Sequence, residues 1–197
     1  MNEGFRPTGI VAIQGSGPIG IAAGIIARLC GAYKIILLGA PKSRLDLADN
    51  LGIFDYIIDI QEISDVQKRI EMVKEMTPEK IGVDLVVDST GVADAIPEGL
   101  EMLRRGGVYL ESGSFVNTGE TTINPFKHIC YKDVYLLGHY GSPPESYSVA
   151  LRFLEMAWRD RRIPLDKIVT HKFPLEKTEE ALIHQQKKKG MKAVIRP

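Results

Sequence analysis

The stretch that decides the fold is Ile10–Gly20, with the sequence IVAIQGSGPIG. Its first five residues are apolar apart from Gln14, which is typical of a short buried strand. Three glycines then follow with the spacing G-x-G-x-x-G, and an apolar segment of helical length comes directly after them. A strand, a glycine turn and a helix in this order predict a loop that holds a phosphate group at the start of the helix.

Each residue type in this loop has a physical reason. Gly15 permits the tight turn, Gly17 lets the backbone approach a pyrophosphate, and Gly20 lets the helix and the strand pack closely. Pro18 suits the first helical turn, where a missing N–H group costs nothing. We therefore predict a dinucleotide site, with a glycine turn that holds no ligand as the alternative.

Working outward from this loop, strand-like and helix-like segments alternate as far as residue 144. Continuous apolar strands separated by helices indicate a parallel sheet that is covered on both faces. Right-handed crossovers then give an α/β fold with a doubly wound six-stranded parallel sheet. The predicted strands are 10–14, 34–38, 56–59, 84–88, 108–112 and 133–138, and the predicted helices are 18–32, 43–51, 62–76 and 93–103.

The dipeptide Pro143-Pro144 marks a predicted domain boundary. We predict a dinucleotide-binding domain over residues 1–144 and a C-terminal segment over residues 145–197. The segment is expected to form a helix, a strand, a helix and a strand, at 145–159, 168–173, 175–185 and 192–197. The three lysines 187–189 indicate a cationic, solvated helix end.

The composition excludes several classes of protein. Lys and Arg total 25 and Asp and Glu total 25 in the 197 residues, so the formal net charge is zero. A neutral chain lacks the basic surface of a nucleic-acid binder. No apolar run has the length of a membrane span, and the N-terminus lacks the pattern of a signal peptide. We expect a cytoplasmic protein with no membrane partner.

The strand KIILL ends at Gly39, where a dinucleotide-binding fold usually has the Asp or Glu that binds the adenosine ribose. Without a carboxylate there is room for a 2′-phosphate and no charge to repel it. Lys42, Ser43 and Arg44 follow, and they can supply charge and hydrogen bonds to a phosphate. We therefore predict NADP(H), with NAD(H) as a close alternative. In the other interpretation, Lys42 and Arg44 lie on a solvated helix start and bind no phosphate.

No catalytic and no metal-ligating residue is predicted in this chain. The two cysteines and four histidines lack the spacing of a metal site. Carboxylates at predicted strand ends either form a pair for acid–base chemistry or have a structural role near the crevice. These residues are Asp84, Asp88 and Glu111.

Five motifs in order resemble one family: VAIQGSGPIG, RLDLADNLG, DLVVDSTG, LRRGGVYLESG and INPFKHICYKDVYLLG. Together they are similar to the coenzyme-binding half of the medium-chain dehydrogenases, the zinc-type alcohol dehydrogenase family. The resemblance covers essentially the whole chain. It implies a Rossmann domain that binds NAD(P), in an oxidoreductase that transfers a hydride between an alcohol and a carbonyl.

The resemblance also assigns cofactor-binding residues. It implies a pyrophosphate loop, a ribose contact, a loop beside the adenosine and a loop beside the nicotinamide. The pyrophosphate loop is Gly15, Gly17, Pro18, Ile19 and Gly20; Gly39 and Arg44 lie at the ribose; Ser89, Thr90 and Gly91 match the adenosine loop; and Ser112, Gly113 and Ser114 match the nicotinamide loop.

Two further expectations come from the family. Its members pair their sheets into homodimers, through segments that correspond to residues 121–125 and 133–138. Its zinc ligands lie in a catalytic domain that normally precedes the coenzyme domain, and Cys30 and Cys130 do not match them. On this basis the chain looks truncated and inactive alone, with zinc only in the absent domain. The alternative is a stand-alone, non-enzymatic NAD(P)-sensing module.

Overall fold

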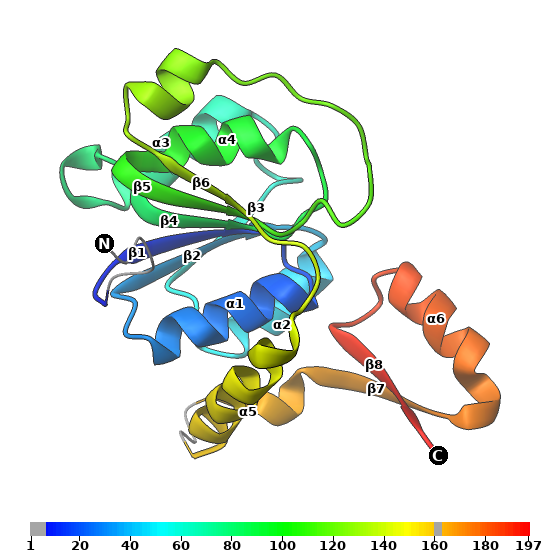
Figure 1. Cartoon of the computed structure of the whole chain (residues 1–197). Coiled ribbons are helices and arrows are strands. Elements are labelled where there is room, and N and C mark those ends of the chain that lie inside the picture. The colour runs from blue at the N-terminus through cyan, green and yellow to red at the C-terminus, as the bar shows by residue number, and fades with distance from the viewer. Residues whose placement is uncertain (1–6, 160–162) are drawn as a thin grey trace.

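A six-stranded parallel sheet forms the centre of the computed structural model, which describes residues 7–159 and 163–197. The strand order is β3-β2-β1-β4-β5-β6. Strands β2 and β3 are therefore added on one side of β1, and strands β4 to β6 are added on its other side. The predicted doubly wound α/β fold is therefore confirmed (Figure 1). The strands are β1 (Ile10–Gln14), β2 (Lys34–Gly39), β3 (Tyr56–Asp59), β4 (Val83–Asp88), β5 (Leu103–Glu111) and β6 (Tyr135–Gly138).

Helices cover both faces of this sheet (Figure 1). Alternate residues of β1 point to opposite faces, as the strand geometry requires. Val11 and Ile13 pack in one core cluster with residues of α1 and α2, whereas Ile10 and Ala12 pack in a second cluster with residues of α3 and α4. The helices are α1 (Pro18–Leu29), α2 (Lys42–Asp49), α3 (Val66–Glu75) and α4 (Ala95–Met102).

One strand begins earlier than predicted. β5 starts at Leu103, within the predicted helix 93–103 and before the predicted strand start at Val108. Leu103 is fully buried and pairs with Val83, and the register between the two strands shifts before Leu85 pairs with Val108. Gly106 and Gly107 therefore lie within β5, in the part of the strand where the register with β4 shifts.

The C-terminal segment forms the predicted helix, strand, helix and strand. These are α5 (Pro144–Arg159), β7 (Val169–Pro174), α6 (Thr178–Gln186) and β8 (Lys192–Arg196), and β7 and β8 form a separate two-stranded parallel sheet. Buried side chains attach the segment to the main sheet domain. Ala157 of α5 and Met191 before β8 lie in the same core cluster as Leu45 and Ala48 of α2.

Within the ranges 7–159 and 163–197, none of the helices has both the length and the apolar composition needed to cross a membrane.

Candidate functional site

The turn between β1 and α1 accepts only glycine at two positions. Gly15 has a φ of +111°, in the region that side chains rarely adopt. A Cβ atom on Gly20 would lie 1.9 Å from the carbonyl oxygen of Gly15, inside any permitted contact. The first and last glycines of the motif are therefore fixed by the geometry of the turn, whether or not a ligand is bound.

Gly17 has no such constraint within the protein. It has a φ of −80° as the N-cap of α1, and the nearest atom to an added Cβ is Arg44 Nη1, at 3.9 Å. The first helical hydrogen bond of α1 joins the Ile21 N–H group to the Gly17 carbonyl, at 3.0 Å. The N–H groups of Ile19 and Gly20 precede that bond, so they remain available to an anion at the helix start.

A cavity of about 390 Å³ lies beside this helix start, at the carboxyl ends of β1, β2 and β4. Ligands of open α/β sheets bind at this edge, where the strand order reverses. Six of the predicted cofactor residues line the cavity: Gly15, Gly17, Gly39, Arg44, Ser89 and Thr90. The cavity brings the glycine loop together with the end of β2, so its lining fits the predicted cofactor.

Gly39 touches the glycine loop closely. A Cβ atom at this position would lie 2.6 Å from both the Cβ and the Oγ atoms of Ser16. The Ser16 hydroxyl donates a hydrogen bond to the Ala40 carbonyl, at 2.9 Å, which fixes this side chain over the end of β2. The absence of a carboxylate at this position therefore has a steric cause within the protein.

The three predicted phosphate contacts after Gly39 occupy different places. Arg44 is buried, and its Nε atom donates a hydrogen bond to the Gly190 carbonyl at 3.2 Å. Burial lowers the pKa of this guanidinium from its usual value. Lys42 forms an exposed ion pair with Asp46, 3.6 Å away, and Ser43 lines a separate cavity between α2 and the C-terminal segment. Of the three residues, only Arg44 lines the central cavity.

The cavity wall formed by α3 and α4 contains a buried ion pair that the sequence did not predict. The Arg69 guanidinium from α3 donates two hydrogen bonds to the Glu98 carboxylate from α4, at 2.7 and 2.8 Å. Arg69 also donates to the carbonyl oxygens of Ile63 and Ser64. The pair joins two helices across the cavity wall, beside the apolar residues Ile60, Val66 and Val92.

The two predicted loops beside the cofactor contact each other. A Cβ atom on Gly91 would lie 3.0 Å from the Gly113 carbonyl oxygen, so the chains of 89–91 and 112–114 pass in direct contact. Glu111 holds the second loop, because its Oε1 atom accepts hydrogen bonds from the N–H groups of Gly113 and Ser114. The residues Gly91, Ser112, Gly113 and Ser114 lie next to the central cavity but do not line it, and neither do Pro18, Ile19 and Gly20.

Asp88 lies beneath these loops in a buried polar network. Its carboxylate accepts hydrogen bonds from the N–H and hydroxyl groups of Thr90 and from the Tyr109 hydroxyl. Burial raises the pKa of Asp88 to about 6, the hydrogen bonds from Thr90 oppose the shift, and the charge of Glu111 adds to it. The same Tyr109 hydroxyl lies 3.3 Å from Gln14 Oε1, which links the network to the end of β1.

Residues 18–156 match the family model described as zinc-binding dehydrogenase, which covers more than half of the chain. This chain belongs to the zinc-binding dehydrogenase family. Two similar proteins are the sorbitol dehydrogenases of Halalkalibacterium halodurans, with 30% identity over 95% of this chain, and Bombyx mori, with 31% identity over 94%. The chain spans about half the length of these relatives, at 52% and 50%.

Solved structures of zinc-binding dehydrogenases have the same fold. An alcohol dehydrogenase from Thermotoga maritima superposes with a TM-score of 0.88 and 27% identity, over 97% of this chain and 50% of its own. A second structure, a zinc-binding dehydrogenase from Sinorhizobium meliloti bound to NADP, has a TM-score of 0.82 and 24% identity, over 98% of this chain and 54% of its own.

The described residues offer no zinc ligand set. Across 7–159 and 163–197, no group of three His, Cys, Asp or Glu side chains lies close enough together to hold a metal ion. We therefore assign none of the described residues to the zinc that gives the family its name.

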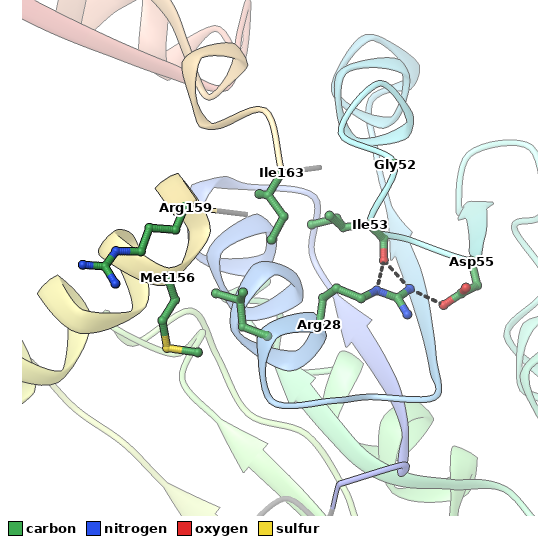
Figure 2. A pocket seen from close by; sticks show the side chains of 8 residues that line it. Arg28, Gly52, Ile53, Asp55, Met156, Arg159 and Ile163 are labelled. Carbon is green, nitrogen blue, oxygen red and sulfur yellow. Dashed lines mark hydrogen bonds and ion pairs between the residues drawn. The ribbon is translucent and has the colours of Figure 1, made fainter. Parts of the chain in front are cut away.

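A second cavity, of about 810 Å³, lies between α1, the segment before β3 and α5. Figure 2 shows that Arg28 in this cavity is bound within the protein, to the Ile53 carbonyl and to Asp55. Arg159 of α5 also lines the cavity, and it forms an ion pair with Glu155, 2.6 Å away. None of the predicted cofactor residues lines this cavity.

Proposed function

We propose that this chain is the coenzyme-binding part of an NAD(P)-dependent dehydrogenase and binds its cofactor in the 390 Å³ cavity. The observation that carries the proposal is the free approach to Gly17 at the start of α1, within that cavity. The pyrophosphate would lie at the edge of the cavity beside Gly17 and reach the N–H groups of Ile19 and Gly20, where the helix dipole favours negative charge. When bound, the nicotinamide supplies the hydride chemistry.

We further propose that NADP(H) binds more tightly than NAD(H). Gly39 presents no carboxylate to repel a 2′-phosphate, and Arg44 places a guanidinium in the same part of the cavity. The only hydrogen-bond acceptor for Arg44 among the described residues is the Gly190 carbonyl, so its Nη1 and Nη2 atoms remain available to a phosphate. The S. meliloti structure supports the proposal in one respect, because it contains NADP in this fold.

Parallel titrations of the chain with NADPH and NADH test both statements. We expect both to bind, with NADPH about five-fold tighter or more, equivalent to roughly 1 kcal/mol. Equal or tighter binding of NADH would contradict the preference for NADP(H) and leave the cofactor site in place. The absence of any binding would contradict the proposed function itself.

The reaction of the whole protein is proposed from its relatives. The names of the similar proteins include sorbitol dehydrogenase and benzyl alcohol dehydrogenase, which act on hydroxyl groups. We propose hydride transfer between an alcohol and a carbonyl, with zinc held by the part of the relatives that this chain does not match. The chain alone would then bind cofactor without turnover, and zinc-dependent oxidation of an alcohol by these 197 residues would contradict this.

A homodimer through the free edge of the sheet is also proposed. β6 pairs only with β5 among the described residues, so its other edge is open to a second chain. Tyr135, Leu136 and Leu137 in this strand are exposed to 41%, 45% and 42%, which is unusual for three successive apolar residues.

A further inference from the structure

The turn between α6 and β8 lies beside the central cavity, although it is far away in the sequence. Figure 1 shows this turn on the side of the C-terminal segment that faces the six-stranded sheet. The Arg44 bond to the Gly190 carbonyl joins the turn to α2, and Met191 is buried to 1% exposure against the core of the main domain. Lys188, in this turn, lines the cavity together with Gly39, Ala40 and Arg44.

The backbone of the turn is held by several hydrogen bonds. The Met191 N–H group donates to the Thr170 hydroxyl at 3.1 Å, and Gln185 binds both the Met191 carbonyl and the Ala193 N–H group. Lys188 itself has a φ of +54°, so it ends α6 in the left-handed conformation that turns the chain back toward β8. The start of the Lys188 side chain is therefore fixed relative to the cavity, while the residue is exposed to solvent.

The charges in the cavity wall are arranged unevenly. On the wall formed by α3 and α4, the Glu98 carboxylate is neutralised by Arg69, and Asp94 accepts a hydrogen bond from the Thr121 hydroxyl. At the end of β2, the wall contains the cations Arg44 and Lys188 and no carboxylate. Within residues 7–159 and 163–197, Lys188 has no carboxylate within ion-pair distance.

We propose that Lys188 contacts the 2′-phosphate of NADP(H) and, with Arg44, selects it over NAD(H). This inference rests on the proposed function, because it places the adenosine ribose at Gly39. A phosphate there would lie between a buried guanidinium and an exposed ammonium, and both form charge-assisted hydrogen bonds with phosphate oxygens. The second cation of the phosphate site would thus come from the C-terminal segment and not from Lys42.

The test compares NADPH and NADH binding to the wild type and to Lys188→Asn. Asparagine tolerates the left-handed conformation, so this variant removes the charge without adding backbone strain. We expect the NADPH dissociation constant to rise about five- to ten-fold and the NADH constant to change less than about two-fold, as one lost charge-assisted hydrogen bond predicts. Lys188→Arg should retain most of the preference.

Lys187→Gln is the matched control, because it removes the same charge one residue away, outside the cavity wall. It should leave both dissociation constants unchanged. Equal weakening of NADPH and NADH by Lys188→Asn would overturn the inference and indicate a pyrophosphate contact or a structural role. An unchanged NADPH constant would overturn it as well, while the wild-type titration would still support the proposed function. A wild type that binds neither dinucleotide would overturn both.

Discussion

Gly39 combines two effects at the scale of a single residue. The absence of a side chain leaves no carboxylate at the end of β2, and it also makes room for Ser16, whose Cβ and Oγ atoms lie 2.6 Å from the place of an added Cβ. Substituting Gly39 alone with Asp would therefore change the packing and the charge at the same time. A Cβ atom there would also lie 2.9 Å from the Ser16 N atom, so the two effects are separated by comparing Asn with Asp at this position in a protein without the Ser16 side chain.

We predict that Gly39→Asp in a Ser16→Gly background reverses the proposed preference for NADP(H) over NAD(H). A carboxylate there would repel a 2′-phosphate and accept hydrogen bonds from the ribose hydroxyls of NADH. NADPH binding should weaken by about ten-fold or more relative to NADH, equivalent to about 1.4 kcal/mol. Calorimetric titration of Ser16→Gly, Ser16→Gly/Gly39→Asn and Ser16→Gly/Gly39→Asp with both cofactors measures this. A shift of the same size in the asparagine variant would show that charge is not the cause.

Asp88 should make the stability of the protein depend on pH in a specific direction. Its pKa is raised in the folded state to about 6, above the usual 3.8, so the folded protein holds this proton more tightly than the unfolded chain. The free energy of unfolding from this group therefore falls as the pH rises from about 4 to about 6. Burial is the main cause, and Glu111 at the end of the neighbouring strand adds to it.

Asp88→Asn removes this titration and should gain stability relative to the wild type as the pH rises. The difference between the two proteins should change by on the order of 2 kcal/mol between pH 4 and pH 7 in favour of the variant. Urea unfolding at a series of pH values measures it, and Asp46→Asn, at an exposed carboxylate of α2, controls for loss of charge. A constant difference between Asp88→Asn and wild type would disprove the raised pKa.

At the scale of elements, the turn from β1 to α1 contains one glycine that folding requires, Gly20, and one that cofactor binding is expected to require, Gly17. Gly20→Ala would place a methyl group against the Gly15 carbonyl, so we expect a loss of at least about 2 kcal/mol in the free energy of unfolding. Gly17→Ala has space in the protein, and the extended backbone of Gly17, with a φ of −80° and a ψ of 176°, is one that alanine adopts. It should change stability by less than about 0.5 kcal/mol yet weaken both cofactors about ten-fold, because the methyl group blocks the pyrophosphate.

Thermal unfolding and fluorescence titration of the two alanine variants distinguish these effects. Normal cofactor binding by a well-folded Gly17→Ala protein would contradict the position proposed for the pyrophosphate. Normal stability of Gly20→Ala would instead contradict the close contact between Gly20 and Gly15.

Local sequence patterns predicted most elements, and long-range contacts account for what they missed. β1 and β2 are continuous apolar runs that end at glycine turns, so their type and position followed from the residues alone. The start of β5 did not, because Leu103 is extended only through its pairing with Val83. The cavity-lining role of Lys188 depends on a contact between Arg44 and Gly190, 146 residues apart, which no local pattern records.

At the scale of the whole molecule, the open edge of β6 determines how two chains could associate. The His139 N–H group donates to the Glu111 carbonyl, at 2.9 Å, toward β5. Because alternate residues of a strand point the same way, the Leu137 N–H group also faces β5, and those of Leu136 and Gly138 face outward. A second copy of β6 would use these outward groups, together with the exposed apolar side chains of the strand.

We therefore predict that Leu136→Pro prevents dimerisation without unfolding the sheet. Proline removes the outward N–H group that a partner strand would bind, and an edge strand tolerates it because no internal hydrogen bond is lost. Sedimentation velocity over a range of concentrations should show a dimer for the wild type and for Leu136→Thr, which keeps the N–H group and introduces a β-branched side chain that suits a strand. The proline variant should sediment as a monomer with the same far-UV circular dichroism. A proline variant that still dimerises would place the interface on another surface, and a monomeric wild type would exclude the dimer.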